Sequence, residues 1–212
     1  NGRDNTVSLA ACRNEVVAFQ LLVEAVRPPL EDVVIQVGPL KGPGDFAIPG
    51  KNMQAYRLWY VHDGEWKPEI CLPLGEKGFA IPDPANKVPD QRNQSLIVDV
   101  WVPKDAPAGS YRGVVTVRAA GVGPFDVPVE LVVWPFSLPD TLSFDCELNA
   151  YSGAPLTADY SWFRLAHAHR TTINVLPYSQ DGTVKSLYAV PLAGEGEGLR
   201  VADWETYDGY FG

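Results

Sequence analysis

The chain has 212 residues, of which 46% are hydrophobic and 20% charged, so it is long and apolar enough to fold around a sizeable core. Its formal net charge of -9 argues against a nucleic-acid partner, because surfaces that bind nucleic acids are usually basic. No apolar stretch reaches the roughly 18 residues of a membrane span, so no membrane contact is expected. The chain opens on Asn1-Gly2-Arg3 with no signal peptide, which leaves a secreted or periplasmic location open.

Cysteines and histidines give no sign of a metal or cofactor. The three cysteines are widely spaced and odd in number, unlike a disulfide scaffold or a zinc site. Two of the three histidines, His167 and His169, are two residues apart, which points them to different faces of a helix. We therefore expect neither a metal nor a cofactor.

The first 135 residues read as short strands separated by proline and glycine. Alternating apolar residues predict strands at 6–11, 17–25, 33–37, 54–61, 96–102, 111–117 and 127–133. About seven short strands with no helix between them are typical of an immunoglobulin-like β-sandwich. We assign residues 1–135 to such a domain.

Two segments interrupt this regularity. Residues 62–94 contain five prolines and several glycines, which favours a long ordered loop over a pair of strands. Residues 103–111 form a turn in which Gly109 can take a positive φ. Tyr111 opens the next strand and is a candidate tyrosine corner, with its hydroxyl bonded to upstream backbone.

The pattern changes after residue 135, and we place a linker at 136–141. An alternating strand follows, then an amphipathic helix carrying Trp162, Leu165 and Ala166 on one face, then a second strand at 172–178. A loop bearing a hairpin at 179–202 and a helix from Asp203 complete the chain. Strand, helix and strand in this order predict a βαβ unit with parallel strands. Because a complete (β/α)₈ TIM barrel takes about 250 residues, residues 142–212 read as the first βα units of an incomplete barrel.

Four segments carry a resemblance to a known family. They are 11–15 (Ala-Cys-Arg-Asn-Glu, followed by Ala18-Phe19-Gln20), 91–95 (Gln-Arg-Asn-Gln-Ser), 102–113 (Val-Pro-Lys-Asp-Ala-Pro-Ala-Gly-Ser-Tyr-Arg-Gly) and 134–139 (Trp-Pro-Phe-Ser-Leu-Pro). The first three resemble the N-terminal sandwich of glycoside hydrolase family 123-like proteins, and the fourth resembles that family's passage into its catalytic barrel.

The resemblance implies a mainly β chain that is the N-terminal portion of a β-N-acetylgalactosaminidase-like enzyme, similar to bacterial relatives. Its chemistry would be retaining hydrolysis of an amino sugar glycoside, in which the substrate's own acetamido oxygen attacks the anomeric carbon. The family's adjacent Asp-Glu pair lies later in the barrel than this chain reaches. No catalytic residue is therefore assigned, and we expect this chain alone, as a fragment lacking the C-terminal barrel segment, to be inactive.

A substrate-binding edge is nevertheless predicted for the present residues. Barrel sites form at the C-terminal ends of the strands, where Glu147, Asn149 and Tyr151 end the first strand and Tyr178 follows the second. Carboxylates and amides suit sugar hydroxyls, and aromatic rings suit the apolar faces of pyranoses. The alternative is that Glu147 and Asn149 fill a polar layer inside the barrel while the tyrosines cover its rim.

A rival hypothesis is a non-catalytic carbohydrate-binding or adhesive β-sandwich module. Trp59, Trp66 and Trp101 would then form a sugar-stacking platform, although scattered tryptophans are more often core or interdomain contacts. Residues 142–178 distinguish the two hypotheses. If they extend the sheets of the sandwich, the hydrolase hypothesis fails.

Overall fold

The computed structural model describes residues 6–142, 144, 146–150, 160–175 and 192–205. The chain is mainly β and divides into two compact units, Asn1–Asp140 and Thr141–Gly212.

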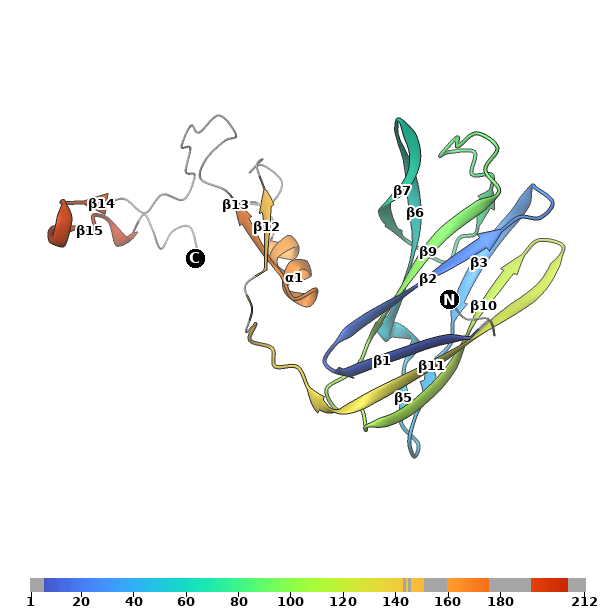
Figure 1. Cartoon of the computed structure of the whole chain (residues 1–212), viewed down its shortest axis with the longest axis horizontal. Coiled ribbons are helices and arrows are strands. Elements are labelled where there is room, and N and C mark those ends of the chain that lie inside the picture. Colours follow the sequence, from blue (N-terminus) through green and yellow to red (C-terminus); the bar gives the residue numbers. More distant parts are fainter. Residues whose placement is uncertain (1–5, 143, 145, 151–159, 176–191, 206–212) are drawn as a thin grey trace. The chain divides into compact units, whose positions relative to one another are not determined.

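Two β-sheets make up the first unit (Figure 1). The strands of the larger sheet are β1 (Val7–Arg13), β3 (Leu30–Val37), β4 (Leu40–Lys41), β5 (Ala47–Ile48), β8 (Phe79–Ile81), β10 (Gly109–Ala119) and β11 (Val122–Ser137). Those of the smaller sheet are β2 (Val16–Glu24), β6 (Met53–Asp63), β7 (Glu65–Pro73) and β9 (Asn93–Trp101), and a 3-10 turn (Gly50–Asn52) precedes β6. The larger sheet has the order β1-β11-β10-β3-β8, with β4 and β5 beside β10, and the smaller has the order β2-β9-β6-β7.

The hydrophobic core of the first unit is built from both sheets. Its main cluster includes Tyr111, Val115 and Leu131 from the larger sheet and Met53 and Val100 from the smaller one. A second cluster consists of Ala25, Val33, Phe79, Ile81 and Leu96. Alternation along the strands directs these side chains inward, and fully burying an aliphatic or aromatic side chain of this size contributes about 1.5–3 kcal/mol. The two sheets therefore pack face to face around a shared apolar layer.

All seven predicted strands are present, but residues 62–94 differ from the predicted long loop. They contain β7, which forms an antiparallel hairpin with β6, and β8, which pairs with β3. The hairpin turns at Asp63-Gly64, a dipeptide that favours such turns, with Gly64 at φ +69°. Pro68 is tolerated because β7 is an edge strand and the ladder is irregular between Trp59 and Tyr60, where Tyr60 pairs with Pro68. The irregular stretches within this segment are the short loop 74–78 and the longer loop 82–92.

Strand β11 continues to Ser137, beyond the predicted sandwich end at 135, so residues 136 and 137 belong to the strand and not to the linker. On the β10 side the last pair joins Gly109 to Val133, so Pro135 lies past the end of that ladder. On the β1 side the ladder is irregular and resumes where Arg13 pairs with Ser137. A proline in an irregular, one-sided stretch costs few ladder hydrogen bonds, which is why Pro135 does not end the strand.

Tyr111 has the upstream backbone bond expected of a tyrosine corner. Its hydroxyl donates a 2.7 Å hydrogen bond to the carbonyl oxygen of Pro107, and its side chain is fully buried. The turn before it contains Gly109 at φ +143°, as expected for a glycine there. The ring meets Phe46 edge-on, with centroids 6.2 Å apart. This hydrogen bond ties the 103–109 turn to the core.

In the second unit, β12 (Glu147–Ala150), α1 (Tyr160–Ala168) and β13 (Thr172–Val175) follow in order. Strands β12 and β13 pair in parallel and form a sheet of their own, which confirms the predicted βαβ unit. Thr171 reinforces the pairing, because its hydroxyl donates a 2.7 Å bond to the carbonyl oxygen of Cys146. These residues add no strand to the two sheets of the first unit.

A small antiparallel hairpin, β14 (Leu192–Ala193) and β15 (Arg200–Val201), lies within the predicted hairpin-bearing loop. A 3-10 turn, Gly196–Gly198, lies between its strands. The helix predicted from Asp203 falls mostly outside the described residues. No described helix has the length and apolarity needed to cross a membrane.

Candidate functional site

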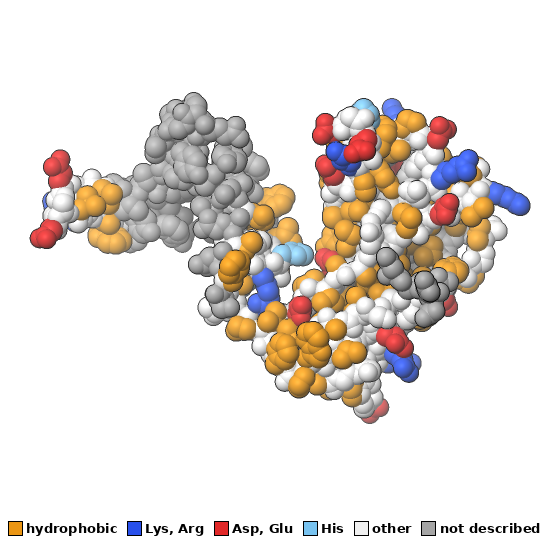
Figure 2. All heavy atoms as spheres, viewed as in Figure 1, with side chains coloured by type: hydrophobic (Ala, Val, Ile, Leu, Met, Phe, Trp, Pro, Cys, Tyr) orange, Lys and Arg blue, Asp and Glu red, His pale blue; other side chains and the backbone are white. Residues whose placement is uncertain are grey.

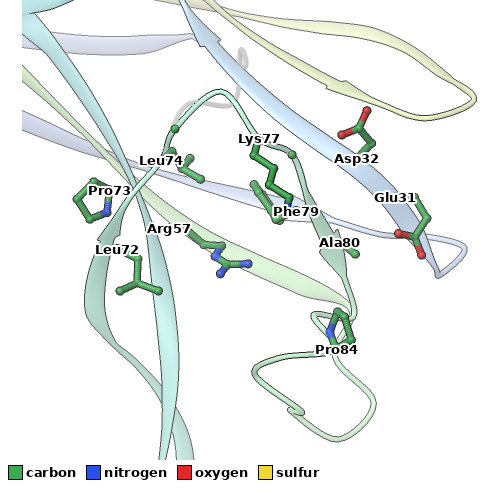
Figure 3. Close-up of a pocket in the computed structure, with 12 residues that line it drawn as sticks. Glu31, Asp32, Arg57, Leu72, Pro73, Leu74, Lys77, Phe79, Ala80 and Pro84 are labelled. Atoms are coloured by element: carbon green, nitrogen blue, oxygen red, sulfur yellow. The ribbon is translucent and has the colours of Figure 1, made fainter.

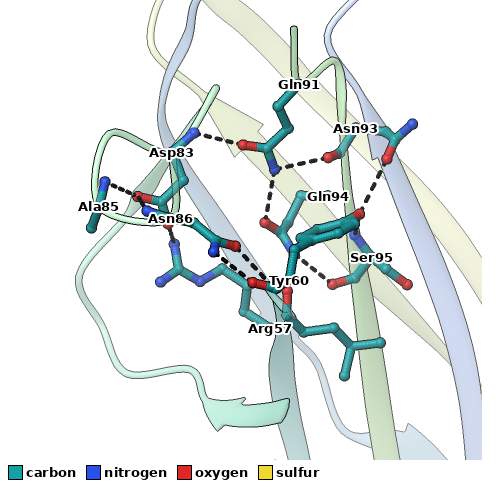
Figure 4. A network of polar contacts seen from close by, with 10 residues as sticks. Arg57, Tyr60, Asp83, Ala85, Asn86, Gln91, Asn93, Gln94 and Ser95 are labelled. Atoms are coloured by element: carbon teal, nitrogen blue, oxygen red, sulfur yellow. Dashed lines mark hydrogen bonds and ion pairs between the residues drawn. The ribbon is translucent and has the colours of Figure 1, made fainter. Parts of the chain in front are cut away.

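A network of buried polar side chains lies where the loop 82–92 meets strands β6 and β9 (Figure 4). At its centre, one carboxylate oxygen of Asp83 forms an ion pair with Arg57. The other accepts hydrogen bonds from the backbone N–H groups of Ala85, at 2.8 Å, and Asn86, at 3.4 Å. The backbone N–H of Asp83 donates to the side-chain oxygen of Gln91 at 2.8 Å. Asp83 therefore organises its own loop and holds Arg57 at the same time.

Side-chain amides complete the network. The side chain of Asn86 accepts a hydrogen bond from the backbone N–H of Tyr60 at 2.9 Å and donates one to the Tyr60 carbonyl oxygen at 2.8 Å. It therefore pairs with β6 in the way that the backbone of a neighbouring strand would. Gln94 donates to the carbonyl oxygens of Leu58, at 2.6 Å, and Ser95, at 3.0 Å. Its own side-chain oxygen accepts from Gln91 at 3.3 Å.

Every buried side-chain nitrogen and oxygen among the described residues has a hydrogen-bond partner. Burying polar groups is costly unless they are bonded, so a fully bonded network stabilises one conformation of the loop. We interpret the network as a support that fixes the position of Arg57.

Arg57 also lines a cavity of about 630 Å³ (Figure 3). Residues 72–75, at the end of β7, form one wall with Arg57, and residues of β3, β8 and the preceding loop form the other. The loop 74–78 joins the edge strand β7 of the smaller sheet to the edge strand β8 of the larger one. The cavity therefore lies at an open side between the two sheets, and its volume is within the range usual for small-molecule sites.

The guanidinium of Arg57 is firmly placed at this cavity. Arg57 pairs with Leu96 across the β6–β9 ladder, so it points to the same face as the apolar core. Its central carbon lies 5.5 Å from the ring centroid of Phe79 and 5.7 Å from that of Trp59, distances at which a cation and an aromatic ring attract. The side chain is 17% exposed. Asp83 and the two rings thus orient a mostly buried cation toward the cavity.

Acidic and basic side chains surround the rim. Glu31, Asp32 and Lys77 line the cavity and are exposed. A β-carbon at Gly78 would lie 2.2 Å from a carboxylate oxygen of Asp32 and 3.0 Å from its backbone, so the close approach of these residues requires glycine. The arrangement offers hydrogen-bond donors and acceptors on facing walls.

Hydrophobic side chains are exposed along the last part of β11. Trp134 and Phe136 stack with centroids 5.9 Å apart and are 45% and 52% exposed, and Val132 on the same strand is 44% exposed. Figure 2 shows hydrophobic side chains gathered at the surface of the first unit near the end of this strand. Clusters of this kind are typical of surfaces that contact another domain or molecule.

The predicted substrate-binding residues lie in or beside the second unit's parallel sheet. In the β12–β13 ladder, Glu147 pairs with Thr172 and Asn149 pairs with Asn174. The side chains of Glu147 and Asn149 are not among those described, so the sugar-binding edge and the internal polar layer both stay open. Tyr151 and Tyr178 lie outside the described residues, and their role stays a prediction.

The three tryptophans considered as a stacking platform are separate. Trp59 packs near Arg57, Trp66 contacts His62 with ring centroids 5.1 Å apart, and Trp101 is 44% exposed. No ring contact joins two of these tryptophans in the described part of the chain. They give no support to a shared platform.

A profile of the glycoside hydrolase 123 N-terminal domain matches residues 1–119, more than half of the chain. The chain belongs to this family. The match covers the strands and loops that build the polar network and the cavity, so both lie within the matched domain of this chain.

A solved structure supports the same fold. A family 123 glycoside hydrolase from Clostridium perfringens, described in work on glycolipid glycan hydrolysis, matches with a TM-score of 0.55 and 15% sequence identity. The match covers 69% of this chain and 26% of that enzyme, so this chain spans about a quarter of the enzyme's length. No curated protein matches the sequence.

Proposed function

We propose that this chain is the N-terminal portion of a β-N-acetylgalactosaminidase-like glycoside hydrolase. Its first unit is an immunoglobulin-like sandwich, and its second unit is the beginning of a TIM barrel. The catalytic acid pair is supplied by barrel residues outside these 212. The amino sugar glycoside is hydrolysed with retention of configuration, because the substrate's acetamido oxygen acts as the nucleophile.

The observation that carries this proposal is the family match over residues 1–119 followed by a parallel βαβ unit in a sheet of its own. Parallel strands joined by a helix are the repeating unit of a (β/α)₈ barrel. If residues 142–178 were an appendage of the sandwich, they would be expected to extend one of its sheets.

Exposed apolar side chains in the second unit also support an incomplete barrel. Among its described residues, large hydrophobic side chains exposed by more than a third are Phe144, Leu148, Trp162, Phe163, Leu165, Leu192, Leu199 and Trp204. Ala166 is the one described hydrophobic residue of this unit that is buried. In a complete barrel, helices and strands of this kind bury such side chains against their neighbours.

In this proposal the edge of the sugar pocket is lined by Glu147, Asn149, Tyr151 and Tyr178. A carboxylate and an amide would hold sugar hydroxyls, and the rings would cover the apolar face of the pyranose. The acid pair would protonate the leaving oxygen and orient the acetamido group.

The experiment is to extend the chain through the reading frame that follows Gly212 and to identify the first sugar product by ¹H NMR with an aryl N-acetyl-β-galactosaminide. We expect an adjacent Asp-Glu pair in the added sequence and a product that is initially the β-anomer. A stop codon directly after Gly212, or a product that is initially the α-anomer, would overturn the proposal.

A further inference from the structure

We propose that the cavity between β6–β7 and β3–β8 binds a neutral carbohydrate. Arg57 would be the fixed hydrogen-bond donor at its base, and Glu31, Asp32 and Lys77 would contact hydroxyls at the rim. This site lies wholly within the first unit, apart from the catalytic site proposed above, and does not depend on it.

Unused donors on Arg57 point to a ligand. A guanidinium has five N–H donors, and in the described structure the single protein acceptor recorded for Arg57 is the carboxylate of Asp83. In Figure 3 the Arg57 side chain extends from β6 into the space that Lys77 and Phe79 approach from the other side. Because the ion pair and the rings already hold the guanidinium, a ligand would not have to order it.

The charges around the cavity disfavour an anionic ligand. Asp83 already neutralises Arg57. At the rim, the two carboxylates of Glu31 and Asp32 outnumber the single ammonium of Lys77. No ion pair is recorded for these three side chains in the described structure. An anion would therefore meet net negative charge.

Sugar hydroxyls match this arrangement because each can donate to a carboxylate and accept from a guanidinium or ammonium group. Apolar side chains also line the cavity, among them Leu72, Leu74 and Pro84, and they suit the C–H face of a pyranose. The open side between the sheets leaves room for further sugar units of a chain. A carbohydrate thus uses the donors, the acceptors and the apolar wall together.

The experiment is a ¹H–¹⁵N NMR titration of the full 212-residue chain with N-acetyl-D-galactosamine, lactose and cellotriose. We expect saturable shifts at the backbone amides of residues 72 and 74–80 with at least one of these sugars. Lys77→Ala and Glu31→Gln should each weaken that binding by about fivefold or more, as expected for loss of a hydrogen bond to a charged group. The matched controls Lys67→Ala and Glu69→Gln change residues of β7 that do not line the cavity, and they should leave the affinity unchanged.

Arg57→Lys tests the base of the cavity. Lysine keeps a charge for Asp83 but lacks the planar fork of donors, so binding should weaken by about tenfold or more while the thermal unfolding curve stays cooperative. The proposal is overturned if no sugar in the panel gives saturable shifts, or if the shifts map outside the cavity. It is also overturned if the control variants weaken binding equally, or if inorganic phosphate, galacturonate or a neutral peptide binds the cavity in place of the sugars. Since the readout is binding, its failure is distinct from a failure of the proposed hydrolase activity.

Discussion

Replacing Tyr111 by phenylalanine removes one hydroxyl from the core of the first unit and leaves the ring in place. The hydroxyl makes a 2.7 Å bond to the carbonyl oxygen of Pro107, and the side chain is fully buried. A hydrogen bond of this kind contributes about 1 kcal/mol net. Because Pro107 is only half-buried, its carbonyl can turn to water, and we expect a loss near that value. For a protein of this size, this corresponds to a fall in Tm of about 3 °C.

Thermal unfolding followed by circular dichroism at neutral pH measures this loss. Tyr56→Phe is the matched control, because Tyr56 is half-buried and its hydroxyl has no hydrogen-bond partner recorded in the described structure. We expect this control to stay within about 0.5 kcal/mol of the parent chain. If Tyr111→Phe melts like the parent, or if both variants lose the same stability, the tyrosine corner does not tie the turn to the core.

The same variant has a signature at alkaline pH. Burial raises the pKa of the Tyr111 phenol, with an opposing effect from Arg13 and a further rise from Asp105. The unfolded chain therefore loses this proton first, so stability is intact below about pH 10, the ordinary pKa of tyrosine, and falls as pH rises beyond it. Urea midpoints of Tyr111→Phe should fall less steeply above that pH than those of the parent. Parallel slopes would contradict the assignment.

Three further outcomes follow from packing, burial and hydrogen bonding. Gly42→Ala would place a carbon 2.2 Å from the ring of Tyr111 and should lower the free energy of unfolding by about 1–3 kcal/mol. The control Gly123→Ala meets open space and should change the free energy of unfolding by less than about 0.5 kcal/mol. Gln94→Leu removes the hydrogen-bond partner of the Leu58 carbonyl oxygen and one partner of the Gln91 amide, and it should lower the free energy of unfolding in urea by about 2–3 kcal/mol. An unchanged urea midpoint would contradict the role of the network. Burial raises the pKa of the Cys12 thiol, and the neighbouring Glu15 raises it further. A thiol reagent near neutral pH should therefore label Cys12 far more slowly than the exposed Cys71. Equal labelling rates would contradict the burial of Cys12.

Periodicity predicted the strands well because most of them bury one face. β9 alternates buried and more exposed residues along most of its length, and its predicted bounds were close. β11 alternates only in its middle part, which is the part that was predicted, and it extends further at both ends. β7 was missed because all of its residues are exposed or half-buried, so the apolar alternation that identifies a strand is weak there. The Asp63-Gly64 turn was the available signal, and the prolines of 62–94 outweighed it.

The polar network and the cavity were not predictable in the same way. Gln91 and Gln94 look like surface residues in the sequence, yet both are at most 5% exposed, because their partners come from β6 and from the loop that folds over it. Asp83 before a proline indicates a turn, but the sequence does not show that this carboxylate meets Arg57, 26 residues earlier. Such sites depend on contacts distant in sequence, whereas the βαβ unit depends on local patterns and was predicted.

The most direct test of the hydrolase proposal is the turnover of 4-nitrophenyl N-acetyl-β-D-galactosaminide by two proteins. One is the 212-residue chain, and the other is the chain extended through the following reading frame. The proposal predicts hydrolysis by the extended chain, its loss when the adjacent acid pair is changed to amides, and none by the 212-residue chain. Clear turnover by the 212-residue chain would contradict the placement of the catalytic pair outside it.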